Sequence, residues 1–157
     1  MTTMTRALLA ALVPLVLAAG PAPAHAVADP QPVQPFVPGT DEDPELSKAW
    51  QRWESRGIDD YVVTVRLSCF CVPQDGVRTV VRDDRTVRVT QGERRLRPGR
   101  GYSVDELFRI VRDAGHEAES VTVDYTRRGI PRSIAIDPVQ AVADDETYLS
   151  VRLVRTD

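Results

Sequence analysis

The segment from Tyr61 to Cys71 constrains the fold most, because it joins a strand pattern to the chain's two cysteines. Apolar and polar residues alternate along it, which is typical of a β-strand with one buried face. The apolar side is expected to hold Tyr61, Val63, Val65 and Leu67, and the other side Thr64, Arg66 and Ser68. The remaining segments can be placed relative to this strand.

Residues 1–26 have the pattern of a secretory signal peptide. Arg6 precedes an apolar run over residues 7–19, and Ala24-His25-Ala26 is a small-x-small cleavage signal. The apolar run is too short for an ordinary membrane span. We therefore expect a secreted protein, extracellular or associated with the cell wall, with no membrane span after cleavage. Retention of the segment as an anchor is the alternative.

The charge balance argues against a nucleic-acid partner. The chain has 20 basic and 23 acidic side chains, and cleavage after Ala26 would remove only Arg6, which changes the net charge from −3 to −4. An acidic chain gives no electrostatic reason to bind nucleic acid. Export also implies oxidising surroundings, where two cysteines are more often paired than free.

Residues 27–44 contain five prolines and no apolar periodicity, so we expect an extended, disordered linker before a single domain at 45–157. A helix is predicted from Pro44, capped by Asp43 and ended by Gly57. A second helix is predicted after Ser103, with Glu106 completing a capping box and Gly115 ending it. Their apolar faces are Leu46, Ala49, Trp50 and Trp53 in the first, and Val104, Leu107, Phe108 and Val111 in the second.

The other segments read as strands. Residues 77–82 and 85–91 predict a hairpin about Asp83-Asp84, and alternation predicts strands near 121–125, 134–137 and 147–155. The expected order is α-β-β-β-α-β-β-β. It predicts an α+β fold, with an antiparallel sheet of about five to six strands and two amphipathic helices packed on one face.

The Cys-x-Cys pair is the chemically unusual spot. Residues two apart in an extended strand have Cα atoms about 6.6 Å apart, near the upper limit for a disulfide. A bridge between Cys69 and Cys71 therefore needs a kink at Phe70, and so short a loop yields only about 1.6 kcal/mol of chain entropy. Three interpretations stay open. The first is a structural bridge that shapes the strand end, and the second is a redox-active pair. The third groups the remaining roles: metal capture, intermolecular pairing and simple buried thiols.

Other candidate sites are weaker. The basic run Arg94, Arg95, Arg97 and Arg100 offers anion binding, with a solvated connection as the alternative. Asp137, Asp144, Asp145 and Glu146 form an acidic loop without the spacing of a calcium site, so no metal is expected. His116 is the one histidine after export, and it lies near a helix end, where it stabilises the helix more often than it catalyses.

An ordered set of motifs resembles the exported bacterial domain-of-unknown-function family 6174. The motifs are Trp53 with Ile58-Asp59-Asp60-Tyr61, then Ser68-Cys69-Phe70-Cys71, the Tyr125–Pro131 turn, and Ile134-Ala135-Ile136-Asp137 before Asp144-Asp145-Glu146. The likeness spans about residues 49–151. It implies an exported or envelope-associated α+β protein and carries no established activity. Thr126 and Arg128 stand where the resemblance leads us to expect an acidic and an aromatic residue.

These observations favour a non-enzymatic binding module that is secreted or located in the cell envelope, with Cys69 and Cys71 bridged at one strand end. A thiol-disulfide or metal-capturing protein that uses the same pair is the alternative. No cofactor is expected. An envelope protein or an anionic polymer is the expected kind of partner.

Overall fold

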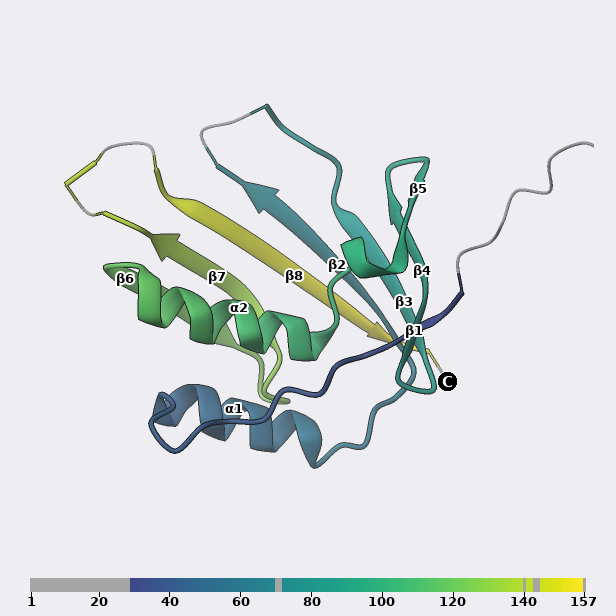
Figure 1. Ribbon diagram of the computed structural model, residues 1–157, viewed down its shortest axis with the longest axis horizontal. Helices are drawn as coiled ribbons and strands as arrows, with labels where there is room; N and C mark the ends of the chain where they lie inside the picture. Colours follow the sequence, from purple (N-terminus) through teal and green to yellow (C-terminus); the bar gives the residue numbers. More distant parts are fainter. Residues whose placement is uncertain (1–28, 70–71, 140, 143–144, 157) are drawn as a thin grey trace, which may run out of the picture.

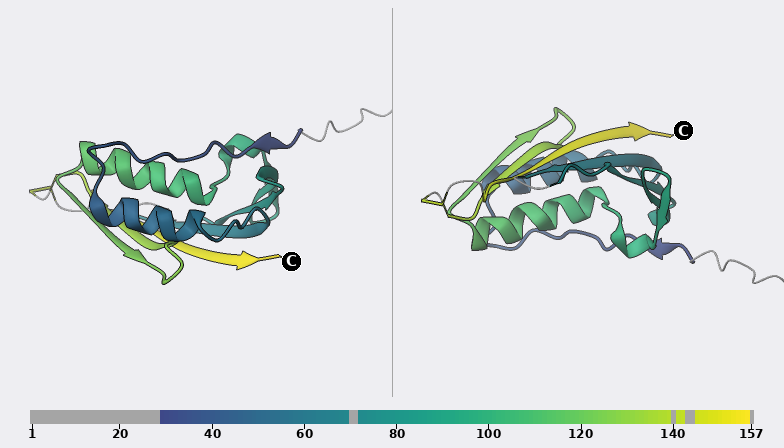
Figure 2. Two further views of the ribbon diagram at one scale, coloured as in Figure 1. Left: turned by 90° about the horizontal axis from the view of Figure 1, so that it is seen from below. Right: turned by 90° about the horizontal axis from the view of Figure 1, so that it is seen from above.

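The computed structural model describes residues 29–69, 72–139, 141–142 and 145–156. Within them, eight antiparallel strands form one sheet, and two helices cover one of its faces (Figures 1 and 2). The elements are β1 (Gln31–Pro32), α1 (Pro44–Glu54), β2 (Tyr61–Ser68), β3 (Val77–Arg82), β4 (Arg85–Gln91), β5 (Arg94–Leu96), a 3-10 turn (Pro98–Arg100), α2 (Val104–Glu117), β6 (Ser120–Tyr125), β7 (Pro131–Asp137) and β8 (Thr147–Arg155). The predicted α+β class is confirmed.

The strands lie in the order β1-β4-β3-β2-β8-β7-β6, with β5 also paired to β4. The strand predicted from Tyr61 is central: it pairs with β3 on one side and along its full length with β8 on the other. The predicted β3–β4 hairpin is confirmed. Asp83 and Asp84 both have positive φ (47° and 52°), as the tight turn of a two-residue hairpin requires.

Both helices begin as their capping residues predict. The Asp43 carboxylate accepts hydrogen bonds from the backbone N–H groups of Glu45 and Leu46, and the Ser103 hydroxyl accepts one from Glu106. The second helix ends two residues later than predicted, because Gly115 stays helical and Ala118 caps the helix. The buried core between helices and sheet includes Leu46, Ala49, Trp53, Tyr61, Val63, Val65, Val104, Leu107, Phe108, Val111, Ile134 and Leu149.

The sheet has more strands than the expected five to six, and the two extra strands lie in segments predicted to be irregular. β1 belongs to the proline-rich segment, where Gln31 pairs with Thr86. β5 belongs to the basic run, where Arg95 pairs with Thr90. Both are short edge additions to β4, and neither carries the alternation that identifies a half-buried strand from sequence.

Residues 29–43 also differ from the expected disordered linker. The segment crosses the helices on the side away from the sheet (Figure 2). Phe36 is 2% exposed and packs against Phe108 at 5.5 Å and Trp50 at 6.5 Å between ring centroids. Burying one phenylalanine contributes roughly 1.5–3 kcal/mol, which offsets part of the cost of ordering the segment.

Candidate functional site

The face of the sheet opposite the helices is the leading candidate site. Side chains alternate between the two faces of a strand, so every second residue of β2, β3, β4 and β8 points away from the helices. These outward positions are Val62, Thr64, Arg66 and Ser68 in β2, Arg78, Val80 and Arg82 in β3, Arg88 and Thr90 in β4, and Tyr148, Ser150, Arg152 and Val154 in β8. Arginine recurs on all four strands, and no carboxylate occupies an outward position of these described strands. We call this surface the open face.

A shallow hollow of about 550 Å³ lies in the middle of the open face. Arg66, Arg78 and Arg152 line it from three neighbouring strands, with Thr64 and Ser150 between them. Val62 and Val154 add an apolar part to its lining. The hollow thus offers guanidinium groups, hydroxyl groups and apolar surface within one area.

The three arginines of the hollow are exposed. None of Arg66, Arg78 and Arg152 forms an ion pair with a carboxylate of the described residues. Like charges gathered on adjacent strands repel one another and give no stability to the fold. Guanidinium groups bind carboxylates and phosphates through two parallel hydrogen bonds, so the arrangement is suited to an anionic ligand.

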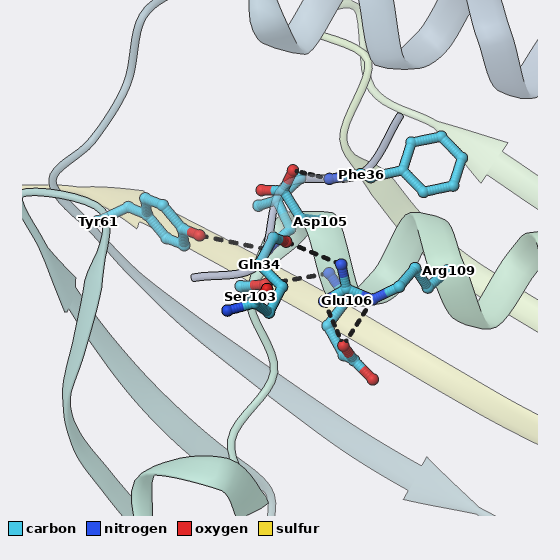
Figure 3. Close-up of polar contacts among 8 residues, drawn as sticks. Gln34, Phe36, Tyr61, Ser103, Asp105, Glu106 and Arg109 are labelled. Atoms are coloured by element: carbon cyan, nitrogen blue, oxygen red, sulfur yellow. Dashed lines mark hydrogen bonds and ion pairs between the residues drawn. The ribbon is translucent and has the colours of Figure 1, made fainter. Parts of the chain in front are cut away.

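A second polar cluster lies where α2 begins, and it holds the N-terminal segment in place (Figure 3). The Asp105 carboxylate accepts a hydrogen bond of 2.8 Å from the backbone N–H of Phe36. Arg109 donates to the carbonyl oxygen of Gln34 at 2.8 Å and pairs with Glu106. The Tyr61 hydroxyl accepts from the backbone N–H of Val104 at 3.3 Å.

Burial raises the pKa values of two groups in this second cluster. The Asp105 carboxyl has a pKa above its ordinary value mainly because it is desolvated, and desolvation also raises the pKa of the Tyr61 hydroxyl. A cavity of about 250 Å³ beside them is lined by Asp59, Asp84 and Asp105 among others. The hydrogen bonds to Phe36, Gln34 and Val104 join parts of the chain that are distant in sequence, so we assign this cluster to structure.

The basic run predicted to bind anions is only partly brought to the open face. Arg94, Arg95, Arg97 and Arg100 are all exposed on β5 and the turn after it. Arg95 pairs with Thr90, an outward residue, and so extends the open face at its β5 edge. Arg94 instead pairs with Gln91 and donates a hydrogen bond to its side chain at 2.8 Å.

The cysteine pair can be placed only in part. Cys69 is half-buried and follows directly after Ser68, the last residue of β2, while Cys71 lies outside the described residues. A bridge between them therefore stays a prediction. Its expected position is the end of the central strand, where β2 parts from β8.

The acidic loop and the histidine show no ligand arrangement. Asp137 ends β7, Asp145 and Glu146 precede β8, and Asp144 lies outside the described residues. Over the described part of the chain, no three His, Cys, Asp or Glu side chains lie close enough to hold a metal ion. His116 is exposed in the last turn of α2, as its predicted place at a helix end implies.

The open-face arginines were not among the sites predicted from the sequence. Arg66, Arg78 and Arg152 lie far apart in the chain, whereas the run at 94–100 is contiguous. The available signal was the alternation itself, because arginine follows Thr64 on the polar side of β2 and recurs at alternate positions of the other strands.

The profile of one protein family matches residues 45–156, and its description reads "Family of unknown function (DUF6174)". No curated protein and no solved structure matches the chain significantly. Among the residues described, no helix has the length and apolar character needed to cross a membrane.

Proposed function

The chain belongs to the DUF6174 family of unknown function, and we propose that it is a non-enzymatic module, secreted or held in the cell envelope, that binds an anionic partner through its open face. The observation that carries this proposal is the hollow lined by Arg66, Arg78 and Arg152, whose charges have no carboxylate partner among the residues that the structure describes. The signal-peptide pattern of residues 1–26 supports export. The predicted Cys69–Cys71 bridge is part of the proposal, as a device that shapes the end of β2.

The charge distribution of the protein favours a charged ligand over a neutral one. The protein is acidic overall, yet the open face concentrates arginines on adjacent strands. A local field of this kind raises the concentration of anions at the surface and speeds their association. Hydroxyl groups of Thr64 and Ser150 beside the guanidinium groups add neutral hydrogen-bonding capacity, which gives the surface some selectivity.

The test compares two triple variants that remove the same charge. One is Arg66→Gln, Arg78→Gln and Arg152→Gln on the open face. The other is Arg94→Gln, Arg97→Gln and Arg100→Gln in the basic run. Binding to immobilised heparin is measured from about 0.05 M to about 0.5 M salt, over which screening strengthens several-fold.

The open-face variant is expected to lose about tenfold or more in affinity, while the basic-run variant keeps most of it. Binding of the unchanged protein should weaken as salt is raised. Loss of binding in the basic-run variant alone would move the site to residues 94–100 and overturn the open-face assignment. Absence of salt-sensitive binding in the unchanged protein would reject the proposal.

A further inference from the structure

One line of side chains crosses five strands of the open face and alternates arginine with threonine. The pairing register places Arg95 opposite Thr90, Thr90 opposite Arg78, Arg78 opposite Thr64, and Thr64 opposite Arg152. The order of strands along this line is β5-β4-β3-β2-β8. Neighbouring strands lie about 4.8 Å apart, so arginine recurs roughly every 9.6 Å with a hydroxyl midway.

This alternation sets the chemistry of a matching ligand. Each guanidinium group is suited to one carboxylate, and each threonine hydroxyl both donates to and accepts from uncharged polar groups. A ligand laid along the line should therefore alternate a charged unit with a neutral one, and each unit should span about one strand spacing. In an extended polysaccharide, one sugar ring advances by about this length.

We infer that the open face binds a linear acidic polysaccharide that carries a carboxylate on every second sugar, laid across the strands along the line from Arg95 to Arg152. This inference rests on the proposed function and names the class of anion. Polymers with a charge on every unit place half of their charges against threonine, the neutral member of the line.

The side chains on both sides of the line fit sugar rings. On one side lie Val80, Val62 and Val154, paired in turn across three strands. Val154 is 48% exposed and Val80 is half-buried, so these two present apolar surface to the C–H faces of sugars, whereas Val62 is only 9% exposed. On the other side lie Arg66, Ser150 and Ser133, paired in turn across β2, β8 and β7. The two serines offer hydroxyl groups, and Arg66 adds one guanidinium group beside the line. Arg88 closes the apolar side, where it pairs with Val80.

The experiment measures affinity of the purified protein for oligosaccharides of equal length. Hyaluronan carries a carboxylate on every second sugar, polygalacturonate on every sugar, and chitin oligosaccharides carry none. Hyaluronan is expected to bind about tenfold more tightly than polygalacturonate despite its lower charge. Chitin oligosaccharides are expected to bind more weakly than both.

Two threonine variants test the line itself. Thr64→Val removes the hydroxyl between Arg78 and Arg152 without changing charge, and it should weaken hyaluronan binding about fivefold, the effect of about one hydrogen bond. It should leave polygalacturonate binding unchanged. Thr122→Val, on the exposed side of β6 and outside the line, is the matched control and should change neither affinity.

The outcomes separate this inference from the proposed function. Equal or tighter binding of polygalacturonate, or preference for polyphosphate or single-stranded DNA, would overturn the alternating polysaccharide while the anion site stands. An unchanged hyaluronan affinity in Thr64→Val would also overturn it. Failure to bind any acidic polymer, heparin included, would reject the proposed function as well.

Discussion

The two faces of the sheet are built from alternate residues of the same strands, yet they differ in solvent exposure and in charge. In β2, Val63 and Val65 are at most 2% exposed beneath the helices, while Thr64 and Arg66 between and beside them face outward. Apolar burial on one face drives folding. On the other face, Arg66, Arg78 and Arg152 have no carboxylate partner in the described residues, so the fold does not account for them.

Because the two faces differ in this way, substitutions on one face should change stability and substitutions on the other should change binding. We call the face of the sheet under the two helices the covered face. This face and the N-terminal segment around Phe36 are expected to determine the free energy of unfolding, and the open face is expected to determine affinity for the anionic partner. Each prediction below tests one side of that division.

The largest effect is expected from Phe36→Ala. The ring packs against Phe108 and Trp50, so its loss leaves a cavity and should lower the free energy of unfolding by about 3–5 kcal/mol. Val37→Ala is the matched control, because Val37 is 69% exposed, and it should cost less than about 0.5 kcal/mol. Equal, small effects in urea denaturation would show that the segment adds nothing to the core.

A buried hydroxyl on the covered face gives the next effect. Thr79 is fully buried, and its hydroxyl oxygen accepts a 2.9 Å hydrogen bond from the backbone N–H of Tyr102. Thr79→Val keeps the shape but leaves that N–H unpaired, at a cost of about 1–3 kcal/mol. Thr90→Val on the open face should change stability by less than about 0.5 kcal/mol. If Thr79→Val left the free energy of unfolding unchanged, the distinction between the two faces would be contradicted.

A smaller, pH-dependent effect is expected from Asp105→Asn. Burial raises the pKa of Asp105 above its ordinary value of 3.8, so the folded state binds more protons than the unfolded state between the two pKa values. Stability from this group therefore falls as pH rises through that window. Asparagine keeps an oxygen for the Phe36 N–H without the charge.

The Asp105→Asn protein should be more stable than the unchanged protein at pH 7, and the difference should shrink as pH is lowered toward 3.8. Denaturant unfolding across this range measures it. Glu117→Gln, exposed on the same helix, is the control for charge alone. An advantage that grows on acidification would contradict the assigned cause.

The smallest effect on stability is expected from Arg78→Gln. The side chain is exposed and lies beside other arginines, so its removal should change the free energy of unfolding by less than about 0.5 kcal/mol, with a slight gain at low salt. Thermal unfolding at low and high salt gives the readout. A loss above about 1 kcal/mol would assign Arg78 to the fold and weaken its assignment to binding.

Most of the fold follows from local patterns in the sequence. Asp43 and Ser103 mark helix starts, Asp83-Asp84 marks a hairpin, and alternation from Tyr61 marks the central strand. The segment around Phe36 could not be predicted in this way. Its order depends on contacts with helices whose residues lie far along the chain, and a single aromatic residue among prolines carries no period.

The candidate site depends on register, which sequence determines weakly. The alternation in the sequence shows that Arg66 points away from the apolar face of its strand. It does not show that Arg78 and Arg152 lie on the adjacent strands around one hollow. Their meeting follows from the β2–β8 pairing between residues 61–68 and 147–155. The run at 94–100 could be predicted as a candidate anion site because its arginines are contiguous, so no strand register is needed to bring them together.

That same β2–β8 pairing determines the order in which the domain is completed. β2 and β3 are among the first strands made, and β6 and β7 form a separate hairpin, so the last nine-residue strand joins the two halves of the sheet. Contacts so distant in sequence have a high contact order and form slowly. The two halves of the sheet can therefore join only after β8 has been made, and the hollow comes into being in that same step.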